Sequence, residues 1–284
     1  MGSDDRELKV SFLSKKEYVC PVCDAHFHKE EMLSGGGRLN AGGLNEELHR
    51  LYLPTAKYGE IFPLIYQATV CPECWYATMD ADFSLLPPKN KDRANDDREQ
   101  RVKETQSIFS NIDFHEPRGL MTGTASQYLV LRCYDFFNKE HSPTVKQGLA
   151  SMRAAWLFDE LNKKFPGQHY DWLAVLFRKK ARYFYTEAIE RDSRGEKIEG
   201  VNIGPDTDKN YGYEGVLYLS AYLQYKYGPS EQGPQRTASL ESAKRVIGKL
   251  FGRGKSSKDK PSDFLIHARN LYDAINKEMG EMDA

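Results

Sequence analysis

Two pairs of cysteines carry the clearest chemical signal in the sequence. Cys20 and Cys23 form one C-P-x-C pair, Cys71 and Cys74 form a second, and 47 residues lie between the pairs. Two residues between ligands let one tight turn direct both thiolates at one ion, and two such turns complete a tetrahedron. We therefore predict a structural Zn²⁺ site with these four cysteines as its ligands. A closed four-thiolate site has no open position for water, so metal-assisted hydrolysis is not expected.

Other uses of the cysteine pairs are weaker. A redox dithiol normally occurs once, at a helix N-terminus in a βαβ unit, and the sequence shows no such context. Ligation of iron by the four cysteines is compatible with the spacing, so zinc and iron both stay open. His26 and His28 follow the first pair and are expected to share one face of a strand rather than bind the ion. Cys133 lies in an apolar helical stretch and is expected to be a small buried side chain.

The elements that must position the cysteines are short strands. Each pair follows an extended run, at 17–19 and at 68–70, as in zinc ribbons, where such turns sit at strand ends. We predict a zinc-ribbon-like β module over residues 8–86, with the glycines near 35–37 and 42–43 in a mobile excursion between the cysteine pairs. Residues 87–104 contain almost nothing to bury and are interpreted as a charged linker or a solvated helix start.

From residue 105 to 284 the apolar residues recur with helical spacing. The pattern predicts helices near 125–137, 143–165, 173–192, 211–227, 240–250 and 264–279. Pro143 is expected to begin the second of these, with Ser142 as its N-cap. Consecutive helices with short connections favour a helical-hairpin domain of tetratricopeptide-like architecture, although no clean 34-residue repeat is present. The predicted fold class is α+β, mainly α.

One predicted helix carries a stripe of tyrosines. At about 100° per residue, the members of this stripe fall within about 60° of one another; they are Tyr211, Tyr218, Tyr222 and Tyr225. The opposite face is apolar as well, and a helix that is apolar on both sides is normally sandwiched between neighbours. The alternative is an exposed surface for a protein partner, because tyrosine is enriched at interaction hot spots.

Composition bounds the remaining possibilities. The chain has 284 residues and a formal net charge of −1, with a mean hydropathy of −0.66. Residues 1–88 hold 8 Lys/Arg against 13 Asp/Glu, or −5, and the rest hold 32 against 28, or +4. Nucleic acid is therefore an unlikely partner for the cysteine module. No run is long enough to span a membrane and no secretory signal is visible, so we expect a cytoplasmic protein without membrane insertion.

No catalytic constellation can be assembled from the sequence. The stretch 252–256, Gly-Arg-Gly-Lys-Ser, lacks the earlier glycine of a phosphate loop and follows a helix where a strand is required, so it is interpreted as a flexible basic loop. The histidines are scattered, and no Ser/His/Asp or Cys/His set stands out. The sequence therefore nominates no catalytic residue.

The stretch 62–77 around the second pair resembles the second knuckle, the tight turn that holds a cysteine pair, of a bacterial family called domain of unknown function 2225. Residues 20–23 with Phe27 resemble its first knuckle, and the helical run including 131–134 and 154–156 resembles its tetratricopeptide-like tail. Asp24 and Trp75 stand where such knuckles usually have glycine, which tolerates a positive φ. Asp accepts that conformation and Trp does not, so either the second knuckle turns differently or packing holds Trp75 in place.

The resemblance implies no established activity. The favoured hypothesis is a structural-zinc protein of the bacterial cytoplasm that acts as an adaptor, with its helical domain binding an unidentified protein. The alternatives are a zinc-ribbon protein that binds nucleic acid and an enzyme of unrecognised type.

Overall fold

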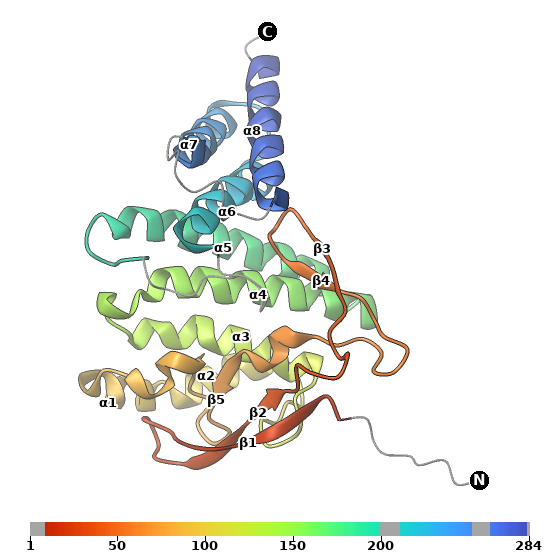
Figure 1. Ribbon diagram of the computed structural model, residues 1–284. Coiled ribbons are helices and arrows are strands. Elements are labelled where there is room, and N and C mark those ends of the chain that lie inside the picture. The colour runs from red at the N-terminus through yellow and green to blue at the C-terminus, as the bar shows by residue number, and fades with distance from the viewer. Residues whose placement is uncertain (1–8, 199–210, 252–261, 283–284) are drawn as a thin grey trace.

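Short β-hairpins lead into a stack of α-helices (Figure 1). The computed structural model describes residues 9–198, 211–251 and 262–282, and these contain three antiparallel hairpins followed by eight α-helices. The strands are β1 (Ser11–Val19), β2 (His26–Met32), β3 (Ala41–Leu44), β4 (Arg50–Tyr52), β5 (Ala68–Val70) and β6 (Ala77–Met79). The helices are α1 (Lys91–Asp96), α2 (Arg98–Ile108), α3 (Leu120–Cys133), α4 (Pro143–Lys164), α5 (Tyr170–Asp192), α6 (Gly212–Tyr227), α7 (Pro234–Phe251) and α8 (Ser262–Met282).

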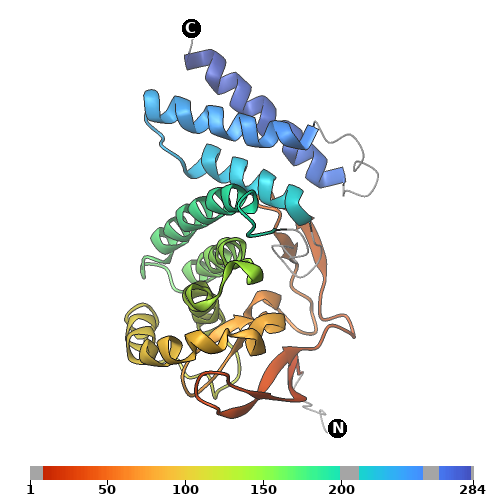
Figure 2. The same ribbon diagram turned by 90° about the vertical axis from the view of Figure 1, so that its left-hand side faces the viewer.

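The helices from α3 to α8 follow one another through the stack in chain order (Figures 1 and 2). Each of them packs against the next, and all six predicted helices are present within a few residues of their expected bounds. The mainly helical fold with small β-hairpins is thus confirmed. The tetratricopeptide-like character of the helices stays a prediction.

Helix α4 begins at Pro143 with Ser142 at its N-cap, as expected, but the Ser142 side chain does not cap the helix. Ser142 occupies the N-cap position with a φ of 49° and makes no side-chain cap. Its hydroxyl instead donates a hydrogen bond to the carbonyl oxygen of Lys197. The backbone N–H of Thr144 donates to the Glu196 carboxylate at 2.7 Å. The helix start is therefore capped by a residue 52 positions further along the chain.

Helix α4 is buried on both sides and joins two hydrophobic clusters. On one side, Ala154 and Phe158 belong to a cluster that also contains the cysteine knuckles and α3. On the other side, Leu149 and Trp156 belong to a cluster that extends through α6, α7 and α8. The cysteine module therefore shares a core with the helices.

Two connecting segments differ from expectation. Residues 87–104, interpreted as a charged linker or a solvated helix start, contain α1 and most of α2, and α2 is not fully solvated because Arg101 is buried. The excursion between the knuckles is not a free loop, because β3 and β4 form a hairpin whose tip packs against the helices. Figure 1 shows this hairpin rising along the stack toward α6 and α8. At its tip Glu47 and Leu48 are buried.

The basic stretch 252–256 lies outside the described residues. Among the helices that the structure describes, none combines the length and the apolar character that crossing a membrane requires.

Candidate metal centre

The first knuckle closes the hairpin formed by β1 and β2. The last paired residues of the two strands are Val19 and His26, and the knuckle lies between them. The N–H of Cys20 donates to the carbonyl of Ala25 at 2.9 Å, and the N–H of Asp24 donates to the carbonyl of Cys20 at 3.0 Å. Asp24 has a φ of 59°, as the position after the second ligand commonly requires.

The second knuckle repeats this turn between β5 and β6. The N–H of Cys71 donates to the carbonyl of Tyr76, and the N–H of Trp75 donates to the carbonyl of Cys71, both at 2.9 Å. Trp75 has a φ of 58°, so the turn is the same and the residue is held by packing. Its ring is buried and meets the Phe114 ring edge-on at 5.2 Å between centroids.

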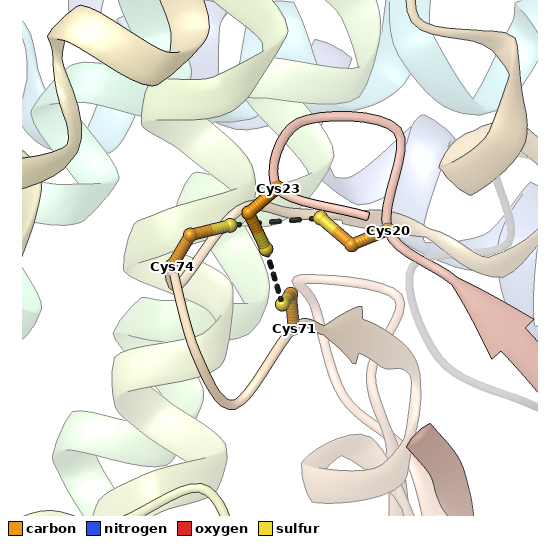
Figure 3. Close-up of side chains that lie close together, drawn as sticks. All are labelled: Cys20, Cys23, Cys71 and Cys74. Carbon is orange, nitrogen blue, oxygen red and sulfur yellow. Dashed lines mark hydrogen bonds between the residues drawn. The ribbon is translucent and has the colours of Figure 1, made fainter. Parts of the chain in front are cut away.

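The two knuckles face each other and bring the four sulfur atoms together (Figure 3). The Sγ atoms of Cys20 and Cys74 are 3.5 Å apart, those of Cys23 and Cys71 are 3.6 Å apart, and all four lie within 4.8 Å of one another. A tetrahedral ion with bonds of about 2.3 Å would place its sulfurs about 3.8 Å apart. The donor set therefore fits one metal ion. An iron–sulfur cluster spreads its cysteines over several irons and needs a wider cage.

The pKa values of the thiols depend on the hydrogen bonds between them. Hydrogen bonding with the Cys20 thiol lowers the pKa of Cys71 and raises that of Cys74. Three of the four cysteines are buried and Cys23 is half-buried. A cation among the sulfurs would stabilise the thiolates and release their protons, which is the usual linkage between metal binding and pH.

A buried arginine joins the second knuckle to the helices through hydrogen bonds. Arg101, in α2, has no exposed surface, and its Nη2 donates to the carbonyl of Cys74 at 2.7 Å. Its Nη1 donates to the carbonyl of Ala94 and to the Asp97 carboxylate, both at 3.0 Å. Four thiolates around a divalent ion carry a net charge of about −2, which a buried guanidinium nearby offsets in part. Sequence reasoning missed Arg101 because a charged run usually marks a solvated surface.

The neighbouring candidates do not join the cluster. His26 lies 3.3 Å from the Glu17 carboxylate, and His28 Nδ1 lies 3.0 Å from the carbonyl of Ser14. Cys133 is fully buried, and its sulfur accepts a hydrogen bond from the N–H of Ala77 at 3.4 Å. The structure agrees with both expectations: His26 and His28 lie outside the site, and Cys133 is buried.

The family resemblance can now be tested against the whole chain. Residues 13–275 match the family described as "Uncharacterized protein conserved in bacteria (DUF2225)". The chain belongs to this family. A relative from Borreliella burgdorferi, described as an uncharacterized protein, is 41% identical over 274 residues, which cover 95% of this chain and 98% of the relative. No solved structure matches the chain.

The tyrosine stripe on α6 is not an exposed surface. Tyr211, Tyr218 and Tyr222 are buried, and Tyr225 is half-buried. Tyr218 donates a hydrogen bond to the carbonyl of Glu46 at 2.7 Å, and Tyr222 donates to the Glu46 carboxylate at 3.3 Å. The interpretation of this stripe as a partner surface is therefore wrong: the tip of the β3–β4 hairpin covers Tyr218 and Tyr222, and the Tyr211 ring stacks on Phe264 of α8.

The same hairpin tip anchors a buried polar network that the sequence did not reveal. The Glu47 carboxylate accepts hydrogen bonds from Trp156 Nε1 at 2.6 Å and from Arg178 Nε and Nη2 at 2.6 and 2.9 Å. Arg178 also pairs with Asp159 at 2.6 Å. His49 stacks on Trp156 at 4.1 Å between ring centroids. A glutamate in a polar loop has no sequence signature for such a role, since its partners lie more than 100 residues away.

Proposed function

We propose that the four cysteines hold a structural Zn²⁺ and that the protein is a cytoplasmic adaptor whose helical domain binds another protein. Zinc is supported by the closed set of four thiols around a space for one ion. Metal analysis of the purified protein tests this part and should find one equivalent of zinc. One equivalent of iron, with the visible absorption of iron bound by thiolates, would contradict it.

The adaptor role is supported by the outer face of α5. Helical spacing of about 100° per residue places Trp172, Val175, Lys179 and Tyr183 on one side of this helix. The exposed fraction is 63% for Trp172, 40% for Val175 and 59% for Tyr183. The opposite side of α5 packs into the core through Phe177. Exposed aromatic residues in a row along a helix favour a protein-binding surface.

The charges beside this α5 face indicate the chemistry of the partner. Lys179 and Lys180 are exposed between the apolar residues. An acidic segment with apolar side chains complements both features, and the lysines would mainly affect the association rate and its salt dependence. The α5 face therefore takes the place of the tyrosine stripe as the proposed partner surface.

Capture of partners from the native cell tests the adaptor role. Trp172→Ala combined with Tyr183→Ala should leave the melting temperature unchanged and abolish capture of the protein retained by wild type. Truncation of hot-spot residues typically costs about 2 kcal/mol or more of binding free energy. Phe12→Ala, which removes another exposed aromatic ring, is the matched control and should capture normally. Equal capture by the double variant and the control would contradict the proposal.

The alternative of nucleic-acid binding has less support. The formal charge of residues 1–88 is −5, and a four-thiolate zinc site adds about two further negative charges. Binding of DNA or RNA depends on neutralised phosphates, so affinity should not exceed the non-specific range of roughly 10⁻⁴–10⁻⁶ M at physiological salt. Sub-micromolar, sequence-dependent binding would favour this alternative instead.

A further inference from the structure

A cavity of about 470 Å³ lies beside the start of α3, away from the cysteine centre. Most of its wall is apolar and comes from Ile61, Phe62, Ile65, Met121 and Phe165. Its polar lining consists of two cationic side chains, Arg118 and Lys164, one acidic side chain, Glu60, and Tyr66. The volume falls within the range of small-molecule sites, about 300–1,000 Å³.

Arg118 is the decisive residue because one of its guanidinium nitrogens has no hydrogen-bond partner among the described residues. Its Nη1 atom is buried and has no hydrogen-bond partner in the described part of the chain. Its backbone N–H donates to the Glu30 carboxylate at 2.6 Å, and the other oxygen of that carboxylate accepts from the Ser11 hydroxyl. The guanidinium lies over the Phe114 ring at 4.9 Å. The charge of Glu30 attracts the guanidinium electrostatically, but both carboxylate oxygens accept hydrogen bonds from other groups.

A buried cationic nitrogen without a hydrogen-bonded partner is costly. Burial lowers the pKa of Arg118 to about 10, which leaves the side chain charged at neutral pH. Proteins normally place a counter-ion or a hydrogen-bond acceptor at such a group. The unmatched Nη1 donor therefore points to a missing anionic acceptor.

Two further features of the cavity favour an anion. Helix α3 has 14 residues, and its first residues, Leu120 and Met121, line the cavity. The N-terminus of a helix carries a partial positive charge of about +0.5. Lys164 adds a cation, although it is partly neutralised by Glu60 at 3.0 Å. The charged groups are few, and most of the remaining wall is apolar.

We propose that this cavity binds a small aliphatic carboxylate, with the carboxylate on the Arg118 guanidinium beside the start of α3 and the hydrocarbon part against Ile61, Phe62 and Met121. The planar guanidinium matches a carboxylate with two parallel hydrogen bonds. The apolar wall distinguishes such a ligand from a bare inorganic anion. This site depends on neither the zinc nor the adaptor proposal.

Calorimetric titration of the full-length protein with three probes tests the site. Octanoate should bind and raise the melting temperature, octanol should bind at least tenfold more weakly, and inorganic phosphate should not bind. Arg118→Met should reduce the affinity for octanoate at least tenfold. Arg269→Met, at an exposed position of α8, is the matched control and should bind octanoate as wild type does.

The stability of the variants separates a binding role from a structural one. Without ligand, Arg118→Met should melt at or above the wild-type temperature, because it removes a buried donor that has no hydrogen-bond partner. If Arg118→Met fails to fold, Ile61→Trp provides the second test, since it fills the cavity from a loop and should abolish octanoate binding. Absence of octanoate binding by wild type, equal binding by Arg118→Met, or equal binding of phosphate would overturn the proposal.

Discussion

Two residues with the same backbone conformation show how side chains compensate for strain. Asp24 and Trp75 follow the second cysteine of their knuckles with φ values of 59° and 58°. Asp is one of the few residues that tolerate this region, and Asp24 is exposed. Trp75 has no such tolerance but packs edge-on against Phe114. The strain at the second knuckle is offset by burial of a large ring.

Glycine substitution should therefore have little effect on stability at Asp24 and a large destabilising effect at Trp75. Asp24→Gly relieves strain and loses only the exposed ion pair with Lys91, so the free energy of unfolding should change by less than about 1 kcal/mol. Trp75→Gly also relieves strain but removes a buried ring, and we expect a loss of about 3–5 kcal/mol. Urea denaturation of the metal-loaded variants measures both. A Trp75→Gly protein as stable as Asp24→Gly would show that packing does not hold the turn.

His49 should make stability depend on pH in a defined window. Burial lowers the pKa of His49 to about 4, whereas the unfolded chain has a pKa of about 6.5 at this residue. The unfolded state therefore binds the proton first, so stability is full above about pH 6.5 and declines as the pH falls toward 4. The loss should reach up to about 3 kcal/mol.

His49→Phe is the comparison that isolates this effect, since phenylalanine can stack on Trp156 but cannot titrate. Carboxylates elsewhere titrate in both proteins and cancel in the difference. The stability difference between wild type and His49→Phe should therefore change between pH 6.5 and 4. A constant difference across this range would contradict the role of His49.

At the scale of elements, the β3–β4 hairpin explains the tyrosine-rich helix α6. Tyr218 and Tyr222 stack at 6.1 Å between centroids, and both hydroxyls bond to Glu46 in the hairpin tip. Residues between the two knuckles thus occupy the face that an outside partner would otherwise use. The hairpin links the cysteine module to α4, α5 and α6 of the helical stack.

Tyr222→Ala tests the docking of this hairpin. The ring is 7% exposed, so its removal leaves a cavity and should cost about 3–5 kcal/mol. Thermal melting should show a decrease of many degrees. Tyr183→Ala removes a tyrosine that is 59% exposed and is the matched control, with little expected change. A Tyr222→Ala protein that melts like wild type would indicate that the face is accessible in solution.

Helices and knuckles were predictable because each has a local signature. Helical spacing of apolar residues located α4 to α8, and the cysteine spacing located both knuckles. Helix α2 was anticipated only as a solvated helix start, because its buried residues, Arg101 and Thr105, are polar and leave no apolar period. The role of Glu47 was missed for a related reason: its burial is determined by Trp156 and Arg178, which only the tertiary fold brings near.

At the scale of the whole molecule, the metal centre and the helices share one core. The cluster that contains Cys71 and Cys74 continues through Leu129 of α3 and Phe158 of α4. A second cluster holds α7 and α8 and does not include the knuckles. Unfolding that follows loss of the metal should therefore spread beyond the β-hairpins and stop before the carboxyl-terminal helices.

Cys71→Ser tests this continuity. Structural zinc contributes an apparent free energy of about 10–16 kcal/mol in small zinc modules, comparable to the whole stability of a typical domain. The variant should lose its metal, and hydrogen exchange should show lost amide protection in the knuckles, α2 and α3, with protection retained in α7 and α8. Cys133→Ser changes a buried cysteine of α3 outside the sulfur cluster and should keep one equivalent of metal. Full protection of α2 and α3 in Cys71→Ser would show that the hairpins unfold alone and that the two parts are energetically separate.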